Sequence, residues 1–279
     1  MDSDLARKEQ RLLEIIGEMP AVVIAFSGGV DSSYLLAACI DSLGAERVEA
    51  LTVDSPLLPR SELDSARVVA RLVGARHRII PFDELQDRNI AANPPDRCYY
   101  CKRLRFQGLL KLAEATAPGS VLLHGENADD HLDYRPGARA AVELGVRAPL
   151  AEAGLSKAEI RELSRRRGLP TWDHPAEACL ATRFPSGTAL TEEGLERVER
   201  AESALHALLG IGGLRVRDHF PLARIELPEE QISRVASDPI RERVAMALRE
   251  AGYRYVTIDL IGYRMGSMND QSAASRSSQ

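Results

Sequence analysis

The 279-residue chain carries 36 lysine and arginine residues against 41 aspartate and glutamate residues, a formal net charge of −5. Its length allows one large or two moderate domains, and 44% apolar with 28% charged residues is typical of a soluble globular protein. The acidic balance argues against an extended nucleic-acid surface, because phosphate binding needs an excess of basic side chains. A local basic pocket is compatible with it.

Two further features of the composition concern the compartment. No apolar stretch approaches the roughly 20 residues of a membrane helix, and the charged N-terminal segment lacks the apolar core of a signal peptide. We therefore expect a cytoplasmic protein with no membrane partner. Four cysteines do not form a disulfide framework in a chain of this length. In a reducing compartment they indicate metal binding or catalysis.

Short apolar runs alternate with helical patterns in the first half of the chain. Ser156 and Glu159 form a capping box at one helix start, and Ser61 with Asp64 is close to such a box at another. Alternation of this kind predicts an α/β fold, a doubly wound parallel sheet with helices on both faces and ligands at the carboxyl ends of the strands. In chain order we expect strand 21–26, helix 33–43, strand 48–53, a helix from Ser61, strand 77–81, helix 101–115, strand 121–124 and a helix from Ser156 to about Arg167.

The second half has a different texture and predicts a smaller α+β domain. A Pro- and Gly-rich segment, 171–188, precedes helix 191–209, strands 214–218 and 222–227, a helix pair over 228–251 and strand 255–260. We therefore expect an ATP-binding domain over 1–170, a cysteine-bearing connecting segment over 171–190 and a substrate domain over 191–268. The polar tail 269–279 is predicted to be disordered.

A glycine-rich loop follows the first predicted strand and leads directly into a helix. Two glycines would allow backbone with positive φ and close approach to an anion, and the amides of the helix start would then bind phosphate. The loop is not a Walker A motif but matches the SGGxDS pattern of pyrophosphatase-loop ATPases, which cleave ATP between the α and β phosphates. The candidate ATP-binding residues are Ser27, Gly28, Gly29, Asp31, Ser32 and Ser33.

Acidic side chains predict a magnesium site beside this loop. Asp31 lies within the loop motif, and Asp129 and Asp130 follow the fourth predicted strand. Because the carboxyl ends of parallel strands meet at one edge of the sheet, either Asp129 or Asp130 would share the metal with Asp31.

Three cysteines are candidates for chemistry, and the residues alone leave three interpretations open. Cys98 and Cys101 form a CxxC pair in sequence typical of a loop, and Cys179 lies 78 residues further on. They would ligate an iron–sulfur cluster with one open iron position, act as a redox pair plus a nucleophile, or be unrelated. Cys39, within a predicted helix, is expected in the core.

Six motifs together resemble the LarE family of ATP-dependent sulfur transferases, over about residues 10 to 270. The glycine-rich loop is shared widely among ATPases, whereas the RFPSG and RIELPE elements are much more specific. The motifs are SGGVDSS, DRCYYCKR, GENADDHLDYRPG, ACLATRFPSG, LRVRDHFPLARIELPE and RYVTIDLIGYRMGSMND.

The resemblance implies a substrate and a reaction. The substrate would be pyridinium-3,5-dicarboxylate mononucleotide, an intermediate in the biosynthesis of the nickel-pincer nucleotide cofactor of lactate racemase. ATP would adenylate a carboxylate with release of pyrophosphate, and a sulfur nucleophile would displace AMP to leave a thiocarboxylate. The family also suggests a homo-oligomer, and a sulfide source would be a partner.

The cysteines match one branch of this family more closely than the other. In one branch a single cysteine, at the position of Cys179, gives up its sulfur and becomes dehydroalanine. The other branch holds a [4Fe-4S] cluster with three cysteines, and Cys98, Cys101 and Cys179 stand at those positions. The resemblance therefore implies a cluster that carries sulfide, with a sacrificial Cys179 as the alternative.

Basic residues would supply the fixed cations that the reaction needs. By resemblance, Arg215 and Arg217 bind the substrate phosphate, and Glu226 and Arg264 line the transfer site, with Glu226 as a catalytic residue. Arg183 and Lys102 neighbour the cysteines and are further candidates for substrate binding.

Three other functions share part of this pattern. A tRNA thiolation enzyme would have the same loop and often three cysteines, but the net charge of −5 counts against it. An ammonia-using amide synthetase would not need the cysteines. A non-catalytic nucleotide-binding module would not need an intact SGGVDSS loop.

Overall fold

The computed structural model describes residues 2–132, 136–175 and 178–264. The chain divides into two compact units, the first formed by Met1–Glu84 and Asp96–Glu177 and the second by Leu85–Pro95 and Ala178–Gln279. The predicted connecting segment, 171–190, is thus divided between the two units. The tail predicted to be disordered, 269–279, lies outside the described residues.

The first unit is built on a parallel sheet of four strands in the order β3-β2-β1-β4. These strands are β1 (Val22–Ala25), β2 (Val48–Asp54), β3 (Arg76–Pro81) and β4 (Val121–His124). In register, Val22 of β1 pairs with Val48 on one side and Val121 on the other. The α/β fold with a parallel sheet, and all four predicted strands, are therefore confirmed.

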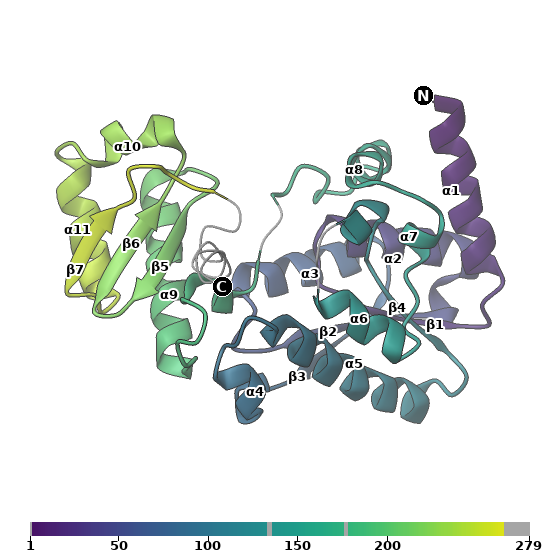
Figure 1. Ribbon diagram of the computed structural model, residues 1–279. Helices are drawn as coiled ribbons and strands as arrows, with labels where there is room; N and C mark the ends of the chain where they lie inside the picture. Colours follow the sequence, from purple (N-terminus) through teal and green to yellow (C-terminus); the bar gives the residue numbers. More distant parts are fainter. Residues whose placement is uncertain (1, 133–135, 176–177, 265–279) are drawn as a thin grey trace, which may run out of the picture. The chain divides into compact units, whose positions relative to one another are not determined.

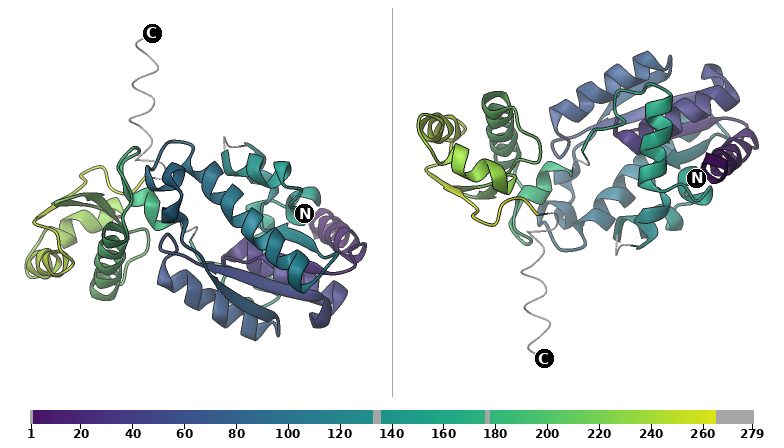
Figure 2. Two further views of the ribbon diagram at one scale, coloured as in Figure 1. Left: turned by 90° about the horizontal axis from the view of Figure 1, so that it is seen from below. Right: turned by 90° about the horizontal axis from the view of Figure 1, so that it is seen from above.

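Helices cover both faces of this sheet (Figures 1 and 2). On one face α1, α2, α3, α7 and α8 share an apolar core with the even-numbered side chains of β1, such as Ile24, and on the other α5 and α6 pack against Val23. The fully buried Cys39 lies in the first of these cores, as predicted. The helices of the first unit are α1 (Asp2–Gly17), α2 (Val30–Leu43), α3 (Arg60–Leu72), α5 (Arg97–Thr116), α6 (Pro136–Glu143), α7 (Pro149–Glu152) and α8 (Lys157–Arg166), whereas α4 (Arg88–Ala91) belongs to the second unit.

Helix starts show where local sequence signals decide and where they do not. The capping box of Ser156 and Glu159 is present at the start of α8, as predicted. The box predicted at Ser61 is wrong, because α3 begins one residue earlier after Pro59, whose fixed φ is compatible with an N-cap. Helix α5 begins at Arg97, four residues before the predicted start at Cys101, so both cysteines are helical and the loop placement expected for Cys98 is wrong.

The second unit contains a smaller sheet of three strands, β5 (Arg215–His219), β6 (Leu222–Glu226) and β7 (Tyr255–Ile258). Strands β5 and β6 are antiparallel and β6 and β7 are parallel. Three helices share an apolar core with this sheet: α9 (Glu192–Leu209), α10 (Glu229–Val235) and α11 (Ile240–Glu250). The predicted second α+β unit is present. No helix in the described part of the chain is long and apolar enough to cross a membrane.

Candidate active site

The glycine-rich loop joins β1 to α2, and its backbone geometry depends on one of its two glycines. Gly28 has a φ of +77°, and a Cβ there would lie 2.6 Å from the Ala66 backbone of α3. Only glycine tolerates both conditions. Gly29 has a φ of −78° and room for a Cβ, so the expected positive φ is wrong at this second position.

The start of α2 presents its amides without a side-chain cap. The first amides of a helix lack intrahelical acceptors, which makes this end suitable for a phosphate group. The hydroxyls of Ser27 and Ser32 lie 3.0 Å apart beside it, and Ser32 also donates to the Gly29 carbonyl. Ser33 is 0% exposed, and its hydroxyl oxygen is buried without a hydrogen-bond partner among the described residues.

A second element reaches the same edge of the sheet because β4 is the neighbour of β1. Gly125 follows β4, and a Cβ at this position would lie 2.8 Å from the Ser32 amide nitrogen, so the two segments pack backbone to backbone. The side chain of Asn127 donates to Asp31 Oδ2 over 3.4 Å, and the Asn127 amide donates to Asp130. The structure thus brings Asp31 and the acidic segment together at the point where the strand order reverses, which is where α/β sheets bind ligands.

Lys157, which belongs to no motif in the sequence, completes this site. Its Nζ lies 2.7 Å from Asp31 Oδ2, and its backbone amide donates to the Asp129 carboxylate. The capping box of Ser156 fixes Lys157 at the first position of α8. That motif located the helix start, but only the packing of α8 beside α2 shows that the residue faces the loop.

Asp31 has an unpartnered oxygen atom and a shifted pKa. Its Oδ1 atom is buried and has no hydrogen-bond partner among the described residues. Burial raises the pKa of Asp31, the Lys157 ammonium opposes this shift, and the Asp130 carboxylate adds to it. A buried carboxylate oxygen without a partner suits a hard cation such as Mg²⁺.

Two cysteines lie in the first turns of α5. Cys98 and Cys101 are three residues apart on this helix, so they share one face, and Cys98 is exposed whereas Cys101 is half-buried. Because α5 leads into β4, its N-terminus lies at the carboxyl edge of the sheet. Lys102 packs its aliphatic chain on Gly137 and forms no ion pair in the described part of the first unit.

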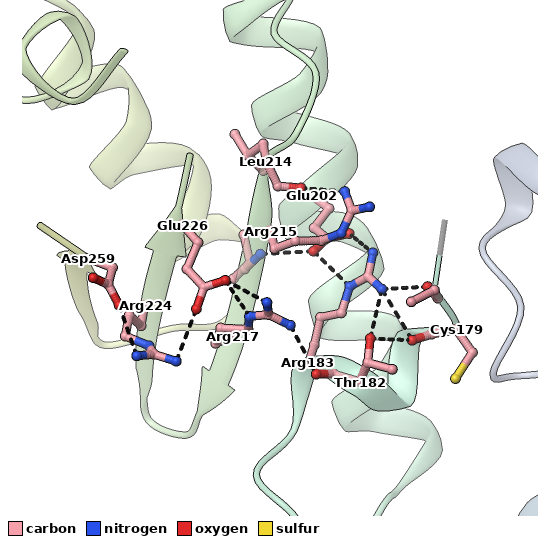
Figure 3. A network of polar contacts seen from close by, with 12 residues as sticks. Cys179, Thr182, Arg183, Glu202, Leu214, Arg215, Arg217, Arg224, Glu226 and Asp259 are labelled. Atoms are coloured by element: carbon pink, nitrogen blue, oxygen red, sulfur yellow. Dashed lines mark hydrogen bonds and ion pairs between the residues drawn. The ribbon is translucent and has the colours of Figure 1, made fainter. Parts of the chain in front are cut away.

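The third cysteine lies in the second unit, just before the 3-10 turn Leu180–Arg183 (Figure 3). Cys179 is half-buried, and its sulfur points away from the neighbouring arginines. Arg183 is 1% exposed and pairs with Glu202 of α9 through Nη2 at 2.8 Å. Arg183 is predicted to contact the substrate, but in the structure its guanidinium binds Glu202 inside the protein. Within either unit, no three Cys, His, Asp or Glu residues of the described chain form a metal site.

Arginines of β5 and β6 form the rest of the network in Figure 3. Glu226 is 0% exposed, and its carboxylate pairs with Arg217 at 2.5 Å and with Arg224 at 3.2 Å. By resemblance, Glu226 is expected to be a catalytic residue that lines the transfer site. In the structure it is fully buried, and each of its two carboxylate oxygens is paired with an arginine. Arg224 and Glu226 lie two residues apart on β6, so their side chains share one face of the sheet, as this ion pair shows.

Arg215 and Arg264 have other surroundings. Arg215 donates to the Leu214 carbonyl and stacks over the Tyr263 ring, 5.5 Å from its centroid, and no acidic partner for it occurs in the described residues. A buried guanidinium without a counter-ion suits an anionic ligand. Arg264 follows Tyr263 directly and is exposed.

The amino-acid sequence of this chain is similar to those of several known proteins. No protein-family model matches the chain. The chain is 43% identical over 265 residues to an uncharacterized protein of Synechocystis sp., which covers 95% of this chain and 98% of that protein. It is 38% identical over 266 residues to the pyridinium-3,5-bisthiocarboxylic acid mononucleotide synthase of Lactiplantibacillus plantarum, with 95% of both chains covered.

A more distant relative bears on the α/β fold of the first unit. An NH(3)-dependent NAD(+) synthetase of Methanosarcina acetivorans is 26% identical over 82% of this chain and 86% of its own length. Its similarity agrees with the parallel sheet and the glycine-rich loop described above. The near-complete match to the L. plantarum synthase shows that this chain is an enzyme and belongs to the LarE family.

Proposed function

We propose that this enzyme uses ATP to activate a carboxylate of pyridinium-3,5-dicarboxylate mononucleotide and then replaces one oxygen of that carboxylate with sulfur. The observation that carries the ATP part is the junction of β1 and β4. There an uncapped helix start, Asp31 and Lys157 meet at one sheet edge. The substrate class follows from the product in the name of the L. plantarum relative.

The first step needs a phosphate site and a cation. The amides at the start of α2 would bind the phosphates, with Ser27 and Ser32 as hydroxyl donors and Lys157 as a further positive charge. Asp31 and Asp130 would hold Mg²⁺, whose chemistry is to neutralise phosphate charge when it is bound. The unpartnered Asp31 Oδ1 supports this assignment.

The reaction follows from the weakness of a carboxylate as an electrophile. A carboxylate oxygen of the substrate attacks the α-phosphorus of ATP, and pyrophosphate leaves with the electrons of the broken P–O bond. A sulfur nucleophile then attacks the acyl carbon of the mixed anhydride, and AMP leaves with the original carboxylate oxygen. Adenylation thus turns a poor leaving group into a good one before the sulfur arrives.

The second unit would bind the anionic end of the substrate. Arg215, which lacks an acidic partner in the described structure, is the strongest candidate for the substrate phosphate. Arg264 and Lys102 are further candidates because neither side chain is buried. Arg217 lies on the same strand as Arg215. Because it already pairs with Glu226, it would add positive charge beside the substrate phosphate and not be its main ligand.

Sulfur would be carried by the three cysteines. Cys98, Cys101 and Cys179 would hold a [4Fe-4S] cluster, which supplies an open iron position for a transferable sulfide when it is bound. The thiolate donor set, with two cysteines on one helical face, fits this group. The alternative is that Cys179 itself gives up its sulfur.

The test is pyrophosphate release by the full-length enzyme, incubated with ATP, Mg²⁺, sulfide and pyridinium-3,5-dicarboxylate mononucleotide. We expect release that depends on the mononucleotide, together with a product whose mass shows oxygen replaced by sulfur. Release with tRNA or ammonia but without the mononucleotide would refute the proposal.

Iron and labile sulfide in anaerobically purified protein decide how the sulfur is carried. About four irons per chain, lost in Cys98→Ala and kept in the matched Cys39→Ala variant, would support the cluster. Iron-free protein whose Cys179 becomes dehydroalanine during turnover would establish the sacrificial alternative.

A further inference from the structure

The backbone around Cys179 is held by an unusual concentration of hydrogen bonds. The Cys179 carbonyl accepts from the Thr182 amide at 3.0 Å, the Thr182 hydroxyl at 2.8 Å and Arg183 Nη1 at 3.2 Å. Arg183 Nη1 also donates to the Ala178 carbonyl at 2.5 Å. The two peptide groups that flank the Cys179 side chain are therefore fixed from the same side (Figure 3).

Arg183 connects these carbonyls to the rigid part of the second unit. The opposite edge of its guanidinium, Nε and Nη2, donates to Glu202 Oε1 and Oε2 at 3.0 and 2.8 Å. Glu202 belongs to α9, and its Oε1 also accepts from the Val216 amide of β5 at 2.8 Å. A continuous chain of hydrogen bonds thus runs from strand β5 through Glu202 and Arg183 to Cys179.

Arg217 adds a second anchor to the same segment. Its Nη1 donates to the Thr182 carbonyl at 3.1 Å, while its other edge is bound by the buried Glu226. Two buried arginines with internal counter-ions therefore hold one short turn. Neither guanidinium reaches the Cys179 sulfur, which points away from both (Figure 3).

We propose that Arg183 and Glu202 are positioning residues that fix the direction of the Cys179 side chain for sulfur transfer. This inference rests on the proposed function for the reaction it serves. A thiol has one rotatable bond from its backbone, so clamping the flanking peptides limits where the sulfur can lie. Only a planar fork with several donors can bind a carboxylate and two carbonyls at once, and lysine cannot replace it.

A second buried pair in the same unit provides a matched comparison. Arg197 of α9 pairs with Asp218 of β5 at 3.0 Å, and both residues are buried. This pair spans the same helix and strand as the Arg183 network, yet in the described structure none of its hydrogen bonds involves the 178–183 segment. It therefore separates general loosening of the unit from loss of the Cys179 clamp.

The experiment compares Arg183→Lys with Arg197→Lys in the full-length protein. Amide hydrogen exchange of the peptide covering 178–184 is measured together with the rates of pyrophosphate release and thiocarboxylate formation. In Arg183→Lys we expect exchange at the Thr182 amide to rise by about tenfold. We also expect sulfur transfer to fall by about tenfold or more relative to pyrophosphate release. The milder Thr182→Val, which removes one of three donors, should move both quantities in the same direction by less.

The Arg197→Lys control should leave exchange in this peptide and the ratio of the two rates as in the wild type. Unchanged exchange in Arg183→Lys, an unchanged rate ratio, or equal changes in both lysine variants would each overturn the positioning role. If the wild type releases no pyrophosphate with the mononucleotide, the proposed function fails, but the exchange comparison still decides whether Arg183 clamps Cys179.

Discussion

Each unit has a carboxylate at the centre of a charged network, half-buried Asp31 in the first and fully buried Glu226 in the second, and the two carboxylates are satisfied to different degrees. Asp31 in the first unit has one oxygen bound by Lys157 and a second, buried oxygen with no hydrogen-bond partner among the described residues. Glu226 in the second unit is 0% exposed, and its two oxygens pair with Arg217 and Arg224. One oxygen of Asp31 is therefore unsatisfied in the described structure, whereas both oxygens of Glu226 are bound by arginines.

This difference separates a binding function from a supporting one. A buried polar atom without a partner costs free energy, so its presence indicates a ligand that completes it. A carboxylate whose oxygens are bound by internal cations has little capacity left for a ligand. We therefore expect removal of charge to affect activity at Asp31 and stability at Glu226.

The largest expected effect is that of Asp31→Asn on pyrophosphate release. The amide removes the negative oxygen proposed to hold Mg²⁺, and we expect release to fall by about a hundredfold or more. Since burial raises the pKa of Asp31, the charged carboxylate is disfavoured in the fold, and its neutral replacement should leave the Tm unchanged or higher. Steady-state release assays and thermal unfolding measure the two quantities.

Asp64→Asn is the control for this substitution. Asp64 lies on α3 with a side chain 69% exposed, and its removal should change neither quantity. If Asp31→Asn retained activity, the metal role would be wrong. If it unfolded the protein, Asp31 would belong to the scaffold, and the contrast with Glu226 would disappear.

The next effect in size is the loss of stability expected for Glu226→Gln. The substitution leaves Arg217, whose side chain is 6% exposed, without its counter-ion. Breaking a buried ion pair by removing one partner costs about 3–5 kcal/mol. Chemical denaturation of the full-length protein, followed by a probe in the second unit, measures the change in the free energy of unfolding.

An exposed ion pair in the same unit provides the control, because its loss should change the free energy of unfolding very little. Glu196 and Arg200 of α9 pair at 3.4 Å with side chains 59% and 55% exposed, so Glu196→Gln should cost less than about 1 kcal/mol. Wild-type stability in Glu226→Gln combined with lost sulfur transfer would restore the catalytic role that the sequence resemblance implies.

Sequence periodicity and motifs predicted the strands and the longer helices from α2 onwards, but not α1, α4, α6 or α7, and not the partners of the charged side chains. The seven strands of the described residues were all predicted; buried β1 is recorded in the sequence as a continuous apolar run, whereas β3 and β7 contain no buried residue. By contrast, Lys157 escaped notice although its helix start was predicted correctly. Its contact with Asp31 depends on how α8 packs beside α2, which no local pattern encodes.

Arg183 illustrates the same limit from the opposite direction. Its place beside Cys179 in the sequence suggested a substrate contact, and the structure shows a residue turned into the protein toward Glu202. Arginine is used both for binding anions and for buried ion pairs. The sequence neighbourhood alone does not distinguish these uses, because the carboxylate partner lies 19 residues away on another helix.

The smallest expected effect concerns one half-buried histidine in each unit. Burial lowers the pKa of His77 in β3, and Arg67 acts in the same direction. Thr52 donates its hydroxyl hydrogen to the Phe26 carbonyl, so His77 Nε2 must be the donor in its 2.7 Å bond to Thr52. Burial also lowers the pKa of His219 in β5, with Arg224 as the second cause.

A histidine whose folded pKa lies below the unfolded value stabilises the fold above that unfolded value, about 6.5, and this contribution is lost as the pH falls. Lowering the pH from about 7 to about 5 should therefore reduce protection from hydrogen exchange slightly in both sheets. His77→Gln should flatten this dependence in β1 and β2 alone, and His219→Gln in β5 and β6 alone. A variant that flattened it in both sheets would show that the two units unfold together, and the comparison between Asp31 and Glu226 would then have to be made on the whole chain.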